Sequence, residues 1–551
     1  MTALPSSANK VVVRLIHWFN ANIISLGREM RLSYLPPLMV YAAAGISGLT
    51  AIVGTFYVKE YLGLSAEFLA MLGFWMMLPW ALKMPLGHLV DLVWRWKSLL
   101  VYLGAGLIAL SVLIMIGLLG YTDEMVEIAS VETWYVAAAL LAPIGYVLQD
   151  VVADAMTVEA VPRVDADGRK IDPDKRKQMH VTMQTLGRVA IIGGGILVSL
   201  ANVYLLRDAA SLSDAEKNDI YLFVYQLALI IPIISIIGVV LAALLHYRDM
   251  ARLMKQGYSR QESESLLGVH VESPSINWWI LGGGLVFTVM SLGIGLSRIP
   301  NGEEIIFLLS MTIVIFLMWR LVGELEPEAR HVLVGTAVLV FVFRALPGPG
   351  AGSTWWMIDE LGFDQQFLAK LSLVGATLTL VGMFIFRRFM AERSIAYIIG
   401  FLTIASTFLS LPIIGMFFGL HEWTASVTGG VVDARFIALI DTALESPLGQ
   451  IAMIPMLAWI ANSAPEKLKA TFFAVMASFT NLALSASQLA TKYINQVYTI
   501  TREVKDPETG QIIVPADYSE LGQLLIMVTI IGFILPLLTI LMVKHSRFRN
   551  A

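Results

Sequence analysis

Apolar runs of about 20 residues recur along the whole chain, separated by short polar stretches. The hydrocarbon core of a bilayer requires about 20 apolar residues in each helix that crosses it. The pattern therefore predicts an all-α polytopic membrane protein with about 14 spans, at about 37–58, 67–90, 98–120, 134–157, 181–203, 220–246, 277–297, 304–321, 332–352, 366–387, 394–419, 435–461, 469–491 and 522–543.

Residues 1–33 are expected to form an amphipathic segment on the cytoplasmic surface. Within 11–27, an apolar stripe is interrupted by Arg14, His17 and Asn20, which favours an interfacial helix over a span. The first ten residues are polar and lack the apolar core of a signal peptide, so we expect the N-terminus to stay in the cytoplasm.

The basic residues fix the predicted orientation. Of 38 Lys and Arg, 26 fall in the segments that this map assigns to the cytoplasm and 8 on the opposite side. Cytoplasmic loops carry an excess of Lys and Arg, so the map places both termini inside, in a cell membrane that we expect to be a bacterial inner membrane.

Composition narrows the class of function. The chain is 57% hydrophobic and 15% charged, and its net charge of −4 argues against nucleic acid as a partner. It has no cysteine, so disulfides and thiolate metal sites are excluded, and its eight histidines have no ligand spacing. P-loop, HExxH and GxSxG motifs are absent. We therefore expect a secondary transporter without cofactor or metal, and not an enzyme.

An internal repeat predicts the architecture. The segment YLGLSAEFLA (61–70) recurs as ELGFDQQFLA (360–369), each in the outer loop after the first span of a six-span set. A parallel duplication of six spans fits the major facilitator fold, with the substrate site between the halves. The expected units are 1–33, an N-terminal half at 34–246, a linker with two inserted helices at 247–330, and a C-terminal half at 331–551.

Carboxylates within apolar runs are the first candidate site residues. Asp150 and Asp154 share one face of the fourth span, and Asp441 and Glu445 repeat the spacing on the fourth span of the second half. An ionised carboxylate in hydrocarbon costs about 3 kcal/mol or more, so it must face a cavity or a partner. Alternatively, Asp154 lies in the headgroup region, and Glu445 is a structural partner of Arg344 or Arg435.

Four cations also fall within the predicted spans: Lys83, Arg188, Arg344 and Lys370. Arg188 and Arg344 lie deepest, so each requires an anion, either a carboxylate of the protein or a substrate. Lys83 and Lys370 lie near span ends, where their side chains can alternatively extend to the interface.

Two stretches are candidate gates. Gly87, Asp91 and Arg95 follow the second span and resemble the major facilitator loop signature, in which an aspartate faces a helix N-terminus of the other half, here near Ser463. The alternative is an ordinary basic loop. In the seventh core span, Pro347 and Pro349 prevent a regular helix from continuing to the outer end.

Two further features have structural interpretations. Trp355 and Trp356 either stack on an aromatic substrate or, the favoured interpretation, belong to the interfacial aromatic belt. The glycines at 193–195 are expected to permit close helix packing.

Four separated motifs resemble the folate–biopterin transporters of the major facilitator superfamily. They are PWALKMPLGHLVD (79–91), DVVADAMTVE (150–159), LGF with FL (361–368), and Asp441, Ser446, Gln450 and Pro455 followed by APEKLKATFFAVMAS (464–478). The match covers both six-span sets but not 247–330. The chain departs from the family at Ser463-Ala464, where a cysteine is usual, at Glu445, where a neutral residue is expected, and in its inserted helices.

The resemblance implies proton-coupled uptake of a pterin or folate by alternating access, and we expect the chain to act as a monomer. A carboxylate can grip the amino-amidine edge of a pterin through two parallel hydrogen bonds, a role open to Asp150, Asp154 and Asp441. Arg188, Arg344 or Lys83 can pair with the glutamate carboxylates of a folate. The alternatives are a permease for another solute such as a muropeptide, or a receptor or assembly factor that transports nothing.

Overall fold

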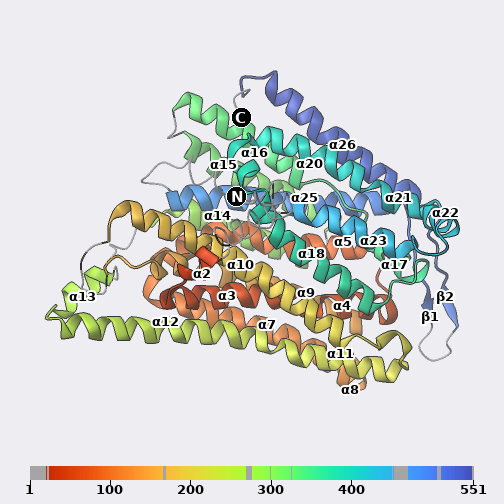
Figure 1. Cartoon of the computed structure of the whole chain (residues 1–551), viewed down its shortest axis with the longest axis horizontal. Helices are drawn as coiled ribbons and strands as arrows, with labels where there is room; N and C mark the ends of the chain where they lie inside the picture. The colour runs from red at the N-terminus through yellow and green to blue at the C-terminus, as the bar shows by residue number, and fades with distance from the viewer. Residues whose placement is uncertain are drawn as a thin grey trace, which may run out of the picture.

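The computed structural model describes residues 20, 24–165, 169, 171–267, 276–297, 299–323, 326–449, 451, 469–505 and 511–548. Most of these residues are helical, and the long helices run side by side in one bundle (Figure 1). The short helix α8 (Thr122–Val126) and the hairpin β1–β2 lie at one end of the bundle, and α13 (Arg260–Leu267) lies at the other. Following the predicted orientation, we name these the outer and the inner end.

The N-terminal half contains the first six predicted spans. After the short α2 (Ser25–Arg28), its helices are α3 (Leu35–Ile46) and α4 (Ala51–Tyr61), α5 (Ala66–Met77) and α6 (Lys83–Leu92), α7 (Lys97–Gly120), α9 (Val131–Ala160), α10 (Pro173–Leu205), and α11 (Asp214–Ala228) with α12 (Ile230–Lys255). The inserted hairpin follows as α14 (Trp278–Leu296) and α15 (Gly302–Val322).

The C-terminal half has shorter helical segments. They are α16 (Pro327–Arg344), α17 (Ala351–Asp359), α18 (Gln365–Ile385), α19 (Arg387–Glu392), α20 (Ile395–Leu409), α21 (Leu411–Phe417), α22 (Leu420–Val427), α23 (Ala434–Glu445), α25 (Lys469–Val497) and α26 (Leu521–Lys544). The strands β1 (Val504–Lys505) and β2 (Ile512–Val514) pair antiparallel before α26.

Eleven helices among the described residues are long and apolar enough to cross a membrane, and each coincides with a predicted span. The expected spans at 332–352, 435–461 and 469–491 are not among the eleven. The helix of the first ends at Arg344, and most of the inner part of the second lies outside the described residues. The third is α25, which carries many polar side chains. The count of 14 therefore stays a prediction, as do the unit boundaries. The amphipathic helix expected at 11–27 lies almost wholly outside the described residues.

The repeat identified in the sequence forms the same local structure twice. Ser65 caps α5 by accepting a hydrogen bond from the Phe68 N–H, and Asp364 caps α18 by accepting one from the Phe367 N–H. A side-chain oxygen at this position satisfies a backbone donor that has no partner within the helix. Each copy therefore starts the second span of its half in the same way, as a duplicated fold requires.

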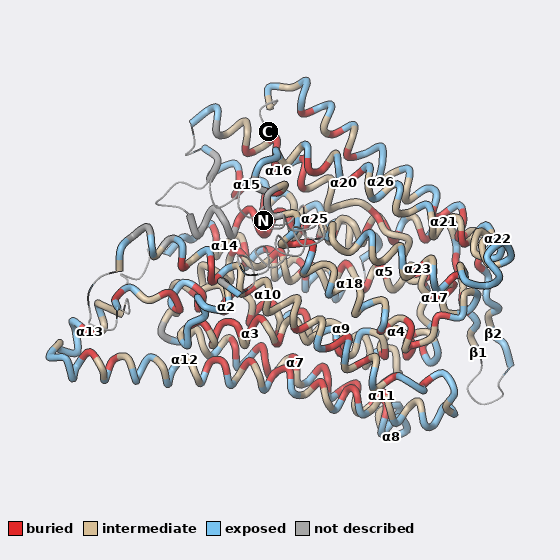
Figure 2. The backbone as a smooth tube through the Cα atoms, viewed as in Figure 1, coloured by how far each residue is buried: buried red, intermediate tan, exposed pale blue. Residues whose placement is uncertain are grey.

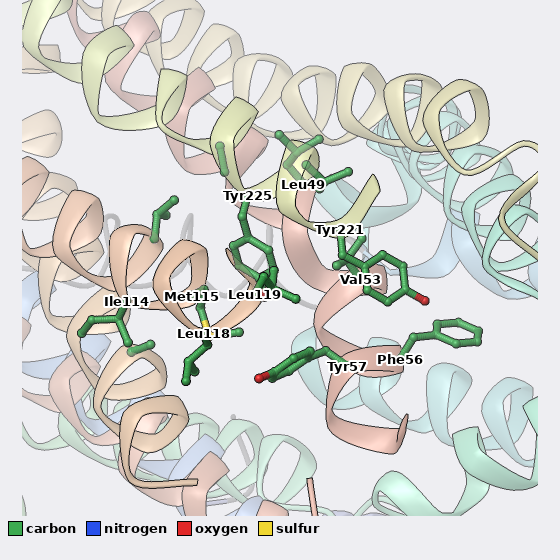
Figure 3. Packing of buried hydrophobic residues seen from close by; sticks show 14 of the residues in the cluster. Leu49, Val53, Phe56, Tyr57, Ile114, Met115, Leu118, Leu119, Tyr221 and Tyr225 are labelled. Atoms are coloured by element: carbon green, nitrogen blue, oxygen red, sulfur yellow. The ribbon is translucent and has the colours of Figure 1, made fainter. Parts of the chain in front are cut away.

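Apolar side chains are distributed as in a membrane protein. Large exposed apolar residues run along the outward faces of α7, α12, α14 and α26, where bilayer lipid would cover them (Figure 2). Inside the N-terminal half, residues of α3–α4, α7 and α11 form a buried cluster that includes Leu49, Val53, Met115, Leu118, Tyr221 and Tyr225 (Figure 3).

Close helix contacts depend on a few glycines. A Cβ on Gly194 of α10 would lie 2.9 Å from backbone atoms of Ala42 and Gly45 on α3, so only glycine permits this approach. Gly193 and Gly195 have nothing within 4 Å of such a Cβ. The expected packing role is therefore confirmed for Gly194 and wrong for its two neighbours.

Candidate functional site

The second span is broken where the first candidate cation lies. Pro79 and Pro85 disturb the helix, so α5 and α6 are joined by a 3₁₀ turn at Leu78–Leu82. Two side chains of α25 satisfy backbone groups at this break: Asn481 donates to the Trp80 carbonyl at 3.3 Å, and Ser478 accepts from the Met84 N–H at 3.0 Å. The break makes Lys83 the first residue of α6.

Lys83 bridges the two predicted carboxylates of α9. Its Nζ lies 2.6 Å from Oδ2 of Asp150 and 2.7 Å from Oδ2 of Asp154. The Tyr41 hydroxyl, on α3, donates to the other oxygen of Asp154 at 2.6 Å. Both carboxylate oxygens of Asp154 are therefore engaged, although its side chain is 39% exposed. The headgroup alternative for Asp154 stays a prediction. Lys83 is held by the two carboxylates of α9. We name Lys83, Asp150, Asp154 and Tyr41 the acidic cluster.

Arg188 and Arg344 come from opposite halves. Arg188, on α10, lies within electrostatic range of Asp150 and Tyr41. Arg344, the last residue of α16, lies within electrostatic range of Arg188. Both side chains are half-buried. Among the described residues, neither guanidinium makes a hydrogen bond or an ion pair, so both remain available to an anion.

The second pair of carboxylates is not part of this group. Asp441 is half-buried on α23, and its Oδ1 is buried with no hydrogen-bond partner among the described residues. Glu445 is exposed at the end of α23. Over the described part of the chain it forms no ion pair with Arg344 or Arg435, and Arg435 pairs with Asp364 at 2.8 Å instead. The structural role considered for Glu445 is therefore wrong for these partners.

The gate predicted after the second span is only partly described. Gly87 and Asp91 lie on α6, and Arg95 lies in the 3₁₀ turn Trp94–Trp96. The helix terminus near Ser463, expected to face Asp91, lies outside the described residues. A gating role for Gly87, Asp91 and Arg95 therefore stays a prediction.

The seventh core span is broken at the two prolines, as the sequence predicted. α16 ends at Arg344, and α17 begins at Ala351 after an irregular segment that contains Pro347 and Pro349. Three polar side chains on one face of α25 satisfy the backbone of this segment: Ser487 donates to the Leu346 carbonyl at 2.6 Å, Thr491 accepts from the Gly348 N–H at 3.0 Å, and Asn495 donates to the Pro349 carbonyl at 3.4 Å.

A cavity of about 590 Å³ lies beside this break, toward the outer end. It is lined by both halves, by residues of the turn Ser47–Thr50, α4, α5, α7, α9, α11 and α12 on one side and of α17 and α25 on the other. None of the predicted charged site residues lines it; its polar lining is uncharged and includes Tyr135, Tyr146, Tyr225, Thr354 and Gln488. Sequence reasoning missed these residues because uncharged polar side chains are ordinary in membrane helices.

Trp355 also lines the cavity, and both it and Trp356 are buried, so the interfacial-belt interpretation is wrong for both.

Contacts between the halves close the outer end above the cavity. Lys59 of α4 pairs with Asp359 of α17 at 2.5 Å, and Arg502 donates to the Lys59 carbonyl. Tyr518 donates to Asp359 at 2.5 Å; burial and this carboxylate raise the pKa of Tyr518, so its hydroxyl keeps its proton. Two more bonds join the halves nearby, from Gln496 to Glu67 at 2.6 Å and from Gln365 to the Tyr221 hydroxyl at 2.9 Å.

Comparison with known proteins agrees with this fold. The chain aligns over 94% of its length with a crystal structure of a POT family transporter in complex with 5-aminolevulinic acid (TM-score 0.59, 11% identity, 96% of that chain). It aligns equally far with a peptide transporter POT in complex with sulfate (TM-score 0.55, 15% identity, 95% of that chain). These likenesses show the major facilitator fold, and the inserted hairpin α14–α15 lies between its two halves in the sequence.

Sequence comparison identifies the family. The chain is 23% identical to a folate-biopterin transporter from Synechocystis sp. over 462 residues, which cover 84% of this chain and 74% of the relative. The profile of the BT1 family matches residues 44–550. A match of this extent, on a multi-pass bundle with the fold of solved transporters, shows that the chain belongs to the BT1 family and is a membrane transporter rather than an enzyme.

Proposed function

We propose that this transporter moves a folate or a related pterin by alternating access, coupled to protons, as a monomer in a bacterial inner membrane with both termini in the cytoplasm. The observation that carries the proposal is that Arg188 and Arg344, from opposite halves, lie within electrostatic range of one another, and that neither forms an ion pair or a hydrogen bond among the described residues. Two unpaired guanidiniums within a membrane bundle are unfavourable unless an anion joins them. The name of the Synechocystis relative supports a folate as that anion.

The glutamate tail of a folate fits this pair. A guanidinium binds a carboxylate through two parallel hydrogen bonds, and the glutamate of a folate carries two carboxylates. Because one arginine comes from each half, a substrate bound to both joins the halves, as a substrate site between two moving halves requires. Lys83, which the sequence also offered as a ligand for the tail, is engaged with Asp150 and Asp154.

The acidic cluster supplies a place for the coupling proton. Lys83, Arg188 and Arg344 carry three positive charges against the two negative charges of Asp150 and Asp154, which leaves one positive charge in the group. Binding of a dianionic tail reverses this balance to one negative charge, and uptake of one proton by Asp150 or Asp154 neutralises it. Charge balance in a low-dielectric interior therefore favours one proton per folate. Asp441, with an unpaired buried oxygen, remains a second candidate for proton or substrate.

Flux into proteoliposomes tests the proposal. Purified protein should accumulate folate when the pH is lower outside, and Arg188→Gln or Arg344→Gln should lower folate uptake by about tenfold or more, the loss of one charge-assisted bond. Both variants should keep uptake of biopterin, which has no carboxylate. Asp150→Asn should abolish stimulation by the pH gradient. Lys370→Gln is the matched control, because Lys370 is an exposed cation of a predicted span whose only bond among the described residues is to Gln366.

Three results would count against the proposal. Equal loss of folate and biopterin uptake in the arginine variants would show that they damage the protein rather than the tail site. If the pH gradient still stimulated uptake in Asp150→Asn and Asp154→Asn, the coupling proton would not bind at the acidic cluster. Absence of folate and pterin flux together with flux of an anhydromuropeptide would assign the chain to a different solute.

A further inference from the structure

The cavity beside the seventh-span break is built for an uncharged, flat group. Its volume of about 590 Å³ lies in the range of small-molecule sites. No Asp, Glu, Lys or Arg of the described part of the chain lines it, so a charged group placed there would lose its hydration without gaining a counter-ion. Aromatic rings of Tyr135, Tyr146, Tyr225 and Trp355 surround the space, and flat ligands pack favourably against such rings.

Three polar groups in this lining have no hydrogen-bond partner among the described residues: the carboxamide of Gln488 and the hydroxyls of Tyr135 and Thr354. The hydroxyls of Tyr146 and Tyr225, by contrast, interact with Ser47 and Thr50. A carboxamide offers a donor and an acceptor side by side. This pair matches the adjacent acceptor and donor on the lactam edge of a pterin. α17 also begins at this cavity without a side-chain cap, so backbone N–H groups of its first turn are available there.

The cavity adjoins the charged group. Tyr146, in the cavity wall, precedes Asp150 of the acidic cluster by four residues on α9, which places the two about 6 Å apart along the helix. Arg344 ends α16 only six residues before Gly350, which lines the cavity. A single elongated ligand with a neutral ring at one end and carboxylates at the other can therefore occupy both places.

We infer that this cavity is the subsite for the pterin ring, with Gln488 as the residue that recognises its edge. The inference rests on the proposed function and divides the substrate between two places. The glutamate tail lies between Arg188 and Arg344, and the uncharged ring lies between Gln488 of α25 and the aromatic wall. Gln488 is then a specificity-determining residue, although it lies outside every motif that the sequence singled out.

Binding of substrate fragments tests the division. The probes are pterin (ring alone), p-aminobenzoylglutamate (tail alone) and folate, each titrated calorimetrically against the purified full-length protein. Gln488→Met removes the donor and acceptor with little change in volume and should weaken pterin and folate binding by about tenfold to a hundredfold. Binding of the tail fragment should stay within about twofold of wild type. Gln366→Met, on α18 and outside the cavity, is the matched control.

A second variant acts on the same group without touching it. A Cβ on Gly73 of α5 would lie 2.5 Å from Oε1 of Gln488, so Gly73→Ala should turn the carboxamide away and weaken pterin binding selectively. Unfolding temperatures measured without ligand show whether either variant misfolds. If one variant misfolds, a selective loss of pterin binding in the other variant still tests the ring subsite.

Each outcome separates the inference from the function on which it rests. Wild-type pterin affinity in a folded Gln488→Met protein would overturn the ring subsite and leave folate transport standing. Loss of pterin binding in Arg188→Gln, with none in Gln488→Met, would place the ring at the charged group instead. Failure of the wild-type protein to bind any of the three probes would refute the proposed substrate itself.

Discussion

Removing the cation of the acidic cluster should destabilise the protein strongly. Lys83→Met would leave Asp150 and Asp154 in the interior without the ammonium that now lies 2.6 and 2.7 Å from their oxygens. Methionine fills a similar volume, so the perturbation is mainly electrostatic. Removing one partner of a buried ion pair costs about 3–5 kcal/mol, because the remaining charge stays desolvated.

Exposure places the expected cost within that range. The side chains of Lys83 and Asp150 are 17% and 18% exposed, whereas that of Asp154 is 39% exposed and can regain some hydration. We therefore expect about 3 kcal/mol, the lower end of the range. Because the entropy of unfolding grows with chain length, this corresponds to a fall in unfolding temperature of roughly 2–3 °C in detergent. Lys370→Met should change this temperature little, because exposed charges contribute about 0–1 kcal/mol.

A double variant tests the electrostatic explanation. Lys83→Met with Asp150→Asn returns the cluster to the single net negative charge of the wild type, with Asp154 still bonded to the Tyr41 hydroxyl. It should therefore be more stable than Lys83→Met alone. Equal destabilisation of the single and double variants, measured by thermal unfolding, would refute the reasoning and indicate lost packing rather than an uncompensated charge.

Three further predictions concern the outer end and the helix contacts. Asp359→Asn removes the ion pair with Lys59 and should open the outer end. A single cysteine placed in the cavity, in a chain that has no native cysteine, should then react several-fold faster with a membrane-impermeant thiol reagent. An unchanged rate would show that this ion pair does not hold the outer end closed. Gly194→Leu should abolish the monodisperse folded peak in size-exclusion chromatography, whereas Gly193→Leu, which meets open space, should retain it. Gly350→Ala combines a φ of +76° with a Cβ 2.8 Å from Asn495 and should lower the unfolding temperature by an amount equivalent to about 1–2 kcal/mol, whereas Gly348→Ala should not.

The sequence predicted the features that depend on local chemistry. Apolar run length located the eleven spans, because a bilayer imposes the same length on every crossing helix. Pro347 and Pro349 located the broken span, because a proline ring is incompatible with a helix interior whatever surrounds it. Asp150, Asp154 and Lys83 were conspicuous because charge is rare in apolar runs.

Features that depend on which helices meet were not predictable. Nothing in the sequence indicates that Lys83 of one span pairs with two carboxylates of another, or that Asp441 does not join Asp150 and Asp154. The cavity was not predicted for the same reason, because Gln488 and Tyr135 line a common space only once α25 and α9 are placed beside it. Trp355 was assigned to the membrane interface by residue type, but it is buried between helices.

The helix α25 links the two parts of the candidate site through its hydrogen bonds. Its inner portion satisfies the break in the second span, next to Lys83, and its outer portion satisfies the break in the seventh span, next to the cavity. These partners belong to opposite halves, so a movement of one half against the other must break or exchange bonds at one of the two breaks. Unpaired backbone groups are costly within a membrane, so such a movement requires water or substrate to replace the lost partners. A site that lies between both breaks is where a bound substrate can supply them.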